Sequence, residues 1–262
     1  MKLSKKLIPA IGMLMLSAVM LVTSSFAWFS MNTTVTATGM TVTAKGDQVY
    51  LEIINSTQTF AANPGLTSVA APDASKLKEN LQPVAPANAI VDGALSYTGV
   101  GNTIKWYSNH SNAIDSHVGV NGYDDVSAND TIYLKNTFKI RLNPNTGATT
   151  ANGLKVSGVK FADGTKITKE FAKCVSVLVV CGENSQLWKQ STTKGTFEQA
   201  TGSTVYLSAD NSNKFTNIAD GVSVDIYLFF NGEDATCTIA KLQEAIDATE
   251  NNYQVEVSFT VQ

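Results

Sequence analysis

Apolar residues recur at every second position in many short stretches of this chain, and Asn, Asp and Gly separate the stretches. Successive side chains of a β-strand point to opposite faces of a sheet, so this alternation predicts strands with one buried face. The most regular stretch is at the C-terminus, where the apolar positions are Tyr253, Val255, Val257, Phe259 and Val261. No regular alternation of strands with helices is present, which favours an all-β fold over a parallel α/β sheet. We therefore predict a two-sheet sandwich of jelly-roll or Greek-key type with one or two short helices.

A second long stretch, at residues 222–230, is apolar on both of its faces. One face holds Val222, Val224, Ile226, Leu228 and Phe230, and the other holds Tyr227 and Phe229. A strand of this kind has to be covered on both sides, so we expect it in the middle of a sheet. Shorter stretches contain Val49, Leu51 and Ile53, then Ile132 and Leu134, then Phe138, Ile140 and Leu142, then Leu154 and Val156, then Val175, Val177 and Val179, and finally Val205 and Leu207.

Residues 61–130 differ from the rest of the chain in composition. They combine long polar stretches with four prolines, Pro64, Pro72, Pro83 and Pro86. We interpret them as an elaborated insertion within a single β-sandwich domain of residues 28–262. Two short helices are expected, one at residues 73–81 and one at residues 238–249, where apolar residues recur at helical spacing.

The N-terminus has the three parts of a secretory signal peptide. Its basic leader contains Lys2, Lys5 and Lys6. Residues 7–22 are mostly apolar, and Ser25 and Ala27 have the small-residue spacing that a signal peptidase recognises. We therefore predict an N-terminal signal helix within a signal peptide of residues 1–27, cleaved between Ala27 and Trp28.

The alternative is an uncleaved helix that anchors the protein in the membrane. Residues 7–22 would form about 24 Å of helix, against a hydrocarbon core of about 30 Å. Pro9 and Gly12 weaken the helix, and no basic stop-transfer cluster follows. We therefore expect secretion to the cell surface or extracellular matrix, with membrane contact only transiently through residues 3–22.

The stretch after the cleavage site, residues 28–44, has the pattern of an uncharged strand. Its pairing residues are expected to be Trp28, Val35, Ala37, Gly39, Met40, Val42 and Ala44. The apolar positions change parity at Gly39, so a bulge or crossover there would keep them facing one core. A strand without Pro or Lys is an unguarded edge. It either joins the sheet of its own domain or inserts into a neighbouring copy, which would make a head-to-tail homopolymer by strand donation.

The junction at residues 26–40 and the C-terminal block at residues 224–262 form a recognisable pair. The junction, FAWFSMNTTVTATGM, places an aromatic pair directly before a strand that contains a Gly, and the C-terminal block combines an aromatic strand, an acidic turn, a helical stretch and a final strand. Both resemble exported proteins of Gram-positive bacteria that are processed by the SipW-type signal peptidase, such as TasA-type biofilm matrix proteins and camelysin. The resemblance implies a jelly-roll domain and secretion. In the TasA branch it also implies extracellular fibres that assemble through N-terminal strand donation.

Charge argues against a nucleic-acid partner. The formal net charge is −3, and Arg141 is the single arginine among nineteen Lys and Arg residues. Nucleic-acid surfaces need a clustered basic face and favour Arg for bidentate phosphate contacts. The expected partners are therefore other copies of this chain, and the signal peptidase during export.

The chain has three cysteines, an odd number for an exported protein. Cys174 and Cys181 are seven positions apart in a strand-like stretch, and an odd separation sends their side chains to opposite faces. They are not expected to bond to each other. Cys237 could pair with either one, and the pairing with Cys181, beside Gly182, is preferred. The alternative is that all three are small buried apolar residues.

Residues suited to catalysis or metal binding are few. No H-E-x-x-H or G-x-S-x-G motif is present, and the only histidines, His110 and His117, lie seven apart in a stretch rich in Gly and Asn. Together with Asp115 they make only a weak candidate for a zinc site. We expect a protein without catalytic residues, metal or cofactor, and a camelysin-like surface metalloprotease is the alternative.

Aromatic residues suggest one more alternative, a membrane-tethered carbohydrate-binding module. The side chains that could stack on sugars are Trp106, Tyr107, Tyr123 and Trp188. Trp106 and Trp188 belong to strand-like stretches, which favours positions in the core. We therefore place this alternative below the structural role.

Overall fold

Strands dominate the part of the chain that the structure describes. The structure, a computed structural model, describes residues 40–45, 51–71, 82–109, 122–161, 174–191, 196–216, 218–234, 237–238 and 255–261. Within these ranges the strands form five sheets, and the helices are two short 3₁₀ turns. A mostly β fold is thus confirmed for this part of the chain. The signal peptide and the helix expected at residues 73–81 lie outside it, as does all but the first residue of the helix expected at 238–249.

The largest sheet has six strands, and every neighbouring pair in it is antiparallel. In spatial order the strands are β14 (Phe197–Gln199), β13 (Asn184–Gln190), β12 (Val175–Cys181), β16 (Val222–Phe230), β9 (Leu134–Leu142) and β2 (Leu51–Asn55). The strand predicted at residues 222–230 is β16, and its place between β12 and β9 confirms that it is central. β9 joins the stretch predicted at Phe138, Ile140 and Leu142 with Leu134 of the stretch before it, whereas Ile132 precedes the strand and belongs to the second core.

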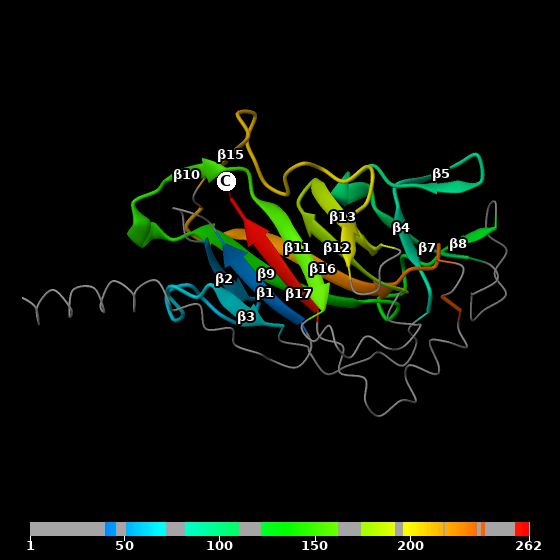
Figure 1. Cartoon of the computed structure of the whole chain (residues 1–262), viewed down its shortest axis with the longest axis horizontal. Coiled ribbons are helices and arrows are strands. Elements are labelled where there is room, and N and C mark those ends of the chain that lie inside the picture. The colour runs from blue at the N-terminus through cyan, green and yellow to red at the C-terminus, as the bar shows by residue number, and fades with distance from the viewer. Residues whose placement is uncertain are drawn as a thin grey trace, which may run out of the picture. The chain divides into compact units, whose positions relative to one another are not determined.

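A second sheet has four strands and contains both the first and the last strand of the described chain. Its order is β11 (Lys155–Phe161), β17 (Val255–Thr260), β1 (Met40–Lys45) and β3 (Ser68–Ala70). In Figure 1 the red arrow of β17 lies between β11 and β1 and crosses in front of β16. β1 pairs with β17 in parallel, whereas β3 and β11 are antiparallel to their neighbours.

Three small sheets complete the described strands. Their members are β4 (Ala85–Ala87), β7 (Lys105–Asn109) and β8 (Tyr123–Asp125) in one, β5 (Ala89–Val91) and β6 (Ala94–Ser96) in another, and β10 (Thr150–Asn152) and β15 (Lys214–Thr216) in the third. The first two lie in the predicted insertion. The 3₁₀ turns are η1 (Gly101–Thr103) and η2 (Pro144–Thr146). The β5–β6 turn has positive φ at Asp92 (51°) and Gly93 (79°), which is the backbone that a tight two-residue hairpin requires.

The main hydrophobic core is formed by side chains of the two large sheets together. Its fully buried members include Phe138, Ile140, Leu142, Val177, Val179, Val224, Ile226, Val257 and Phe259. They alternate along β9, β12, β16 and β17 as the sequence predicts. Residues two apart in a strand share a face, so each strand contributes one complete face to this core.

A second, aromatic core covers the opposite face of the six-stranded sheet. Its buried members are Val84, Trp106, Ile132, Leu178, Leu187 and Phe229. Val84 and Trp106 come from the predicted insertion, so this insertion supplies part of the cover for the outer face of β16. The two-sided cover predicted for that strand is confirmed.

One prediction about an individual strand fails. Val205 and Leu207 were expected to share a strand face, but no strand includes them, and Val205 is 72% exposed while Leu207 is fully buried. For β13 the sequence indicated only a strand-like stretch at Trp188, and its bounds were not predicted because NSQLWKQ is mostly polar. Leu187 belongs to the aromatic core and Trp188 packs against the main core, and local alternation does not reveal this cover.

Truncating a member of the main core tests the shared interior of the two sheets. We expect Phe259→Ala to lower the free energy of unfolding by about 3–5 kcal/mol, because it leaves a cavity between the sheets. The control is Val205→Ala, which should change stability by less than about 0.5 kcal/mol because the side chain is 72% exposed. Urea unfolding followed by circular dichroism measures both, and equal losses would contradict the assignment of this core.

Candidate functional site

The predicted donor strand is divided by the boundary of the described residues. Trp28, Val35, Ala37 and Gly39, together with the cleavage position at Ala27, lie outside the described residues. Met40, Val42 and Ala44 belong to β1. The structure therefore bears on the second half of this segment only.

β1 has a partner strand of its own chain on each side. It pairs with β17 from Met40 opposite Val255 to Lys45 opposite Thr260. On its other side it pairs with β3 over the three residues 41–43. The sequence left two alternatives for this segment, pairing within its own domain or insertion into a neighbouring copy. In the structure residues 40–45 pair within their own domain.

The edge strand β11 carries features that discourage the addition of another strand. It contains a bulge near its start, and Lys155 and Lys160 interrupt its apolar pattern. Lys160 forms an ion pair of 2.8 Å with Glu256 of β17. Bulges and lysines are common guards of sheet edges. Isolated bridges occupy both ends of the strand, Leu154 with Ser208 and Lys160 with Thr196.

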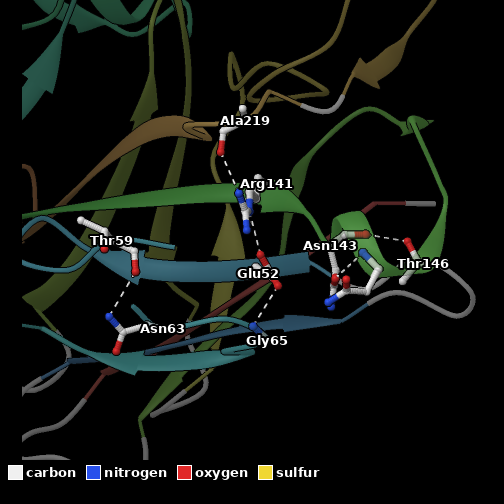
Figure 2. Close-up of polar contacts among 9 residues, drawn as sticks. Glu52, Thr59, Asn63, Gly65, Arg141, Asn143, Thr146 and Ala219 are labelled. Carbon is white, nitrogen blue, oxygen red and sulfur yellow. Dashed lines mark hydrogen bonds and ion pairs between the residues drawn. The ribbon is translucent and has the colours of Figure 1, made fainter. Parts of the chain in front are cut away.

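The edge strand β2 is covered by the chain segment that follows it. The backbone N–H of Ile53 donates to the carbonyl of Leu66 at 2.8 Å. The N–H of Gly65 donates to Oε1 of Glu52, also at 2.8 Å (Figure 2). Groups that point away from β9 thus have partners in the segment at residues 56–66. This edge of the six-stranded sheet is closed.

The closure of β2 is centred on the single arginine of the chain. Arg141 Nε donates to Oε2 of Glu52 at 2.7 Å, and Arg141 Nη1 donates to the carbonyl of Ala219 at 2.8 Å (Figure 2). The guanidinium also lies 4.1 Å from the centre of the Phe60 ring. The side chain of Glu52 is only 1% exposed, so Arg141 supplies the opposite charge that a buried carboxylate requires. Through these contacts the guanidinium connects β9 and β2 with the loops that contain Phe60 and Ala219.

The remaining edges belong to two strands of three residues each. β14 ends the six-stranded sheet and β3 ends the four-stranded sheet. β3 covers only half of the six residues of β1. A strand this short offers few backbone groups for pairing, and it leaves part of its neighbour beyond its reach. β3 is also tied to β2, because Nδ2 of Asn55 donates to the carbonyl of Ala70 at 3.3 Å.

The predicted metal candidates His110, Asp115 and His117 lie outside the described residues. Within the described ranges no group of three or more His, Cys, Asp or Glu side chains is placed to hold a metal ion. The same ranges contain no helix long and apolar enough to span a membrane.

The aromatic residues considered for sugar stacking are largely buried. Trp106 is 6% exposed and lies 4.7 Å from Tyr133 and 5.0 Å from Phe229, measured between ring centres. Trp188 is partly buried and packs against the main core. Tyr107 is buried, and Tyr123 is half-buried. Trp106 and Trp188 therefore occupy the core positions that their strand-like surroundings favoured.

All three cysteines are buried, and the structure joins none of them in a disulfide. Cys181 belongs to the main core between the sheets. Burial and the nearby charge of Asp225 raise the pKa of its thiol to about 11, so it stays protonated at neutral pH. Cys181 faces the intersheet core, to which Cys237 does not belong, so the structure gives no support to the expected Cys181–Cys237 bond.

The pairing of Glu52 with Arg141 was not predicted from the sequence. A signal was present, because Glu52 lies inside the apolar stretch LEIIN and Arg141 is the only arginine. A charged residue in a buried strand requires an opposite charge nearby. The spacing of 89 residues between them gave no indication of which cation this would be.

Comparison with known proteins gives no relative to which function can be traced. No protein-family model matches the chain, and neither a curated protein nor a solved structure matches it significantly.

Removal of the Arg141 side chain tests the closure of β2. We expect Arg141→Ala to cost about 3–5 kcal/mol, because Glu52 is left charged and buried without its partner. The matched control is Lys105→Ala, which removes an exposed ion pair with Asp125 and should cost about 0–1 kcal/mol. Thermal and urea unfolding measure the two variants. A loss below about 1 kcal/mol for Arg141→Ala would show that the edge closes without this pair.

Proposed function

We propose that this chain is an exported structural protein of the cell surface or extracellular matrix, such as a biofilm. In this proposal, copies of the chain assemble into fibres when the N-terminal strand of one copy pairs with a sheet of the next. The fold is taken to be a two-sheet sandwich of jelly-roll type. Support for that fold comes from two large sheets that share one core, with the first and last strands side by side.

The observation that carries the proposal is the position of β1 relative to the residues before it. β1 is an interior strand, held on both sides by its own chain. The residues that precede it, 28–39, are uncharged and have alternating apolar positions. An interior strand anchors the segment attached to it. We therefore assign donation to residues 28–39 and restrict the role of residues 40–45 to holding the donor in place.

Length and pattern make the donor segment suitable for pairing. Twelve extended residues reach about 40 Å, which is longer than a typical strand. Backbone hydrogen bonds would provide the affinity, and Val35 and Ala37 on one face would fix the register. No Pro or Lys interrupts the segment.

The acceptor in this proposal is the β3 side of the four-stranded sheet. β2 and β11 are closed by an ion pair, lysines, a bulge and bridges. β3 is three residues long and pairs with only half of β1. A strand arriving at this side would pair with the part of β1 that β3 does not reach.

Three chains with different starting points test donation. N-terminal sequencing of protein recovered from the culture medium should find Trp28 as the first residue. The chain that begins at Trp28 should form fibres visible by electron microscopy. The chain that begins at Met40 keeps β1 and should stay folded and monomeric by gel filtration. The chain that begins at Gly46 loses β1 and should be unstable, because β17 and β3 each lose a partner.

Each of these chains can contradict part of the proposal. If the chain that begins at Met40 formed fibres, residues 28–39 would not be the donor. Full stability of the chain that begins at Gly46 would contradict the interior position of β1. Recovery of the native protein with Met1 still present would contradict cleavage and secretion.

A charge placed in the donor tests strand pairing without shortening the chain. We expect Val35→Lys to raise the concentration needed for fibre formation at least about tenfold, because the ammonium would have to be buried at the acceptor sheet. The control is Val205→Lys, at a side chain that is 72% exposed, which should assemble normally. Light scattering measures fibre growth of both variants, after thermal unfolding has shown that the two are equally stable. Unchanged assembly of Val35→Lys would count against pairing through this face.

A further inference from the structure

The three buried cysteines have different surroundings. Cys181 is part of the main hydrophobic core. Cys174 is fully buried and Cys237 is 2% exposed, yet neither belongs to either of the two hydrophobic cores. These two thiols are therefore enclosed at another place in the fold.

Cys174 directly precedes β12, which begins at Val175. Its carbonyl accepts a hydrogen bond of 2.7 Å from the N–H of Asn231, which continues the pairing of Val175 with Phe230 by one residue. Side chains alternate along a strand, so Cys174 shares the face of Leu178, a member of the aromatic core. Cys181, seven residues further along, faces the opposite side.

The chain after β16 makes two successive turns before Cys237. The N–H of Asp234 donates to the carbonyl of Asn231 at 3.2 Å, and the N–H of Cys237 donates to the carbonyl of Asp234 at 2.8 Å. Within this turn Glu233 forms an ion pair with Lys189 of β13. Two successive tight turns thus separate Cys237 from Asn231, the residue bonded to Cys174.

The ion pair locates the turn along the β12–β13 pairing. Lys189 is two residues from Leu187, which lies opposite Leu178 in that pairing. Continued by two residues, the same register places Lys189 opposite Ser176, two residues from Cys174. The ion pair therefore ties the turn before Cys237 to β13 at the level of the β12 end that follows Cys174.

From this placement we infer that Cys174 and Cys237 form an intramolecular disulfide when the chain folds under oxidising conditions, and that Cys181 remains a thiol. A disulfide requires Cα atoms about 4.4–6.8 Å apart. Cys181 is seven strand residues from Cys174, about 23 Å away, and faces the other side of the sheet. The inference depends on the proposed export only for the oxidising surroundings.

The bond forms by two thiol–disulfide exchanges with a low-molecular-weight disulfide such as oxidised glutathione. The thiolate of one cysteine attacks that disulfide, which gives a mixed disulfide and releases one reduced glutathione. The second cysteine then attacks the mixed disulfide, forms the Cys174–Cys237 bond and releases a second reduced glutathione. The protein loses two protons and two electrons, and the glutathione disulfide gains them. Both thiols are buried in the folded chain, so exchange takes place while the chain folds.

Refolding of the secreted chain in a glutathione redox buffer tests the inference. The chain is unfolded, reduced, refolded at low protein concentration, alkylated after a second unfolding and mapped by mass spectrometry. We expect a mass about 2 Da below the reduced chain, one linked pair of peptides that contains Cys174 and Cys237, and alkylation at Cys181 alone. The melting temperature should rise by about 5–15 °C over the reduced form, because the bond closes a long loop in the unfolded chain.

Two variants control for the identity of the pair. Cys181→Ser should still form the bond, whereas Cys237→Ser should leave both remaining thiols open to alkylation. Three alkylated cysteines in the wild-type chain, a bond that includes Cys181, or a bond between two copies would each overturn the inference. None of these results depends on fibre growth, so failure of the cross-link and failure of strand donation are observed separately.

Discussion

The parallel pairing of β1 with β17 is the constraint from which the rest of the fold follows. β17 supplies Val255, Val257 and Phe259 to the main core, and it has β11 on one side and β1 on the other. Because β1 and β17 lie near opposite ends of the chain, the four-stranded sheet closes only when distant segments meet. Contacts of such long range are costly in chain entropy and form late in folding. The same pairing fixes the place where the N-terminal segment enters the sheet.

The sheet edges are protected by means that differ from strand to strand. β2 is closed by a buried ion pair and its following loop, and β11 by lysines, a bulge and bridges. Such protection prevents uncontrolled pairing between copies. A protein that assembles by exchange of one strand needs this protection elsewhere, because otherwise every edge would compete as an acceptor. Directed assembly through one edge therefore requires that the other edges be protected.

Alternation along the sequence predicted the strands that are buried through their own side chains. β16 and β17 are apolar at every second position, and this pattern placed them correctly. β13 was indicated only by the strand-like stretch at Trp188, because its mostly polar sequence does not alternate. The partner of Glu52, the cis pairing of residues 40–45 and the position of Cys237 depend on residues far apart in sequence. Local patterns indicate which face is buried, but they do not specify what covers it.

Cis pairing of β1 changes the energetics of strand donation. If residues 40–45 moved to another copy, they would exchange one set of backbone hydrogen bonds for an equivalent set. The cis partner is covalently linked and so present at high effective concentration, whereas a second copy has to be captured from solution at a loss of translational freedom. Exchange of β1 alone therefore opposes assembly. In the proposed fibre, a net gain would have to come from contacts that residues 28–39 make with a neighbour, while β1 keeps its place beside β17.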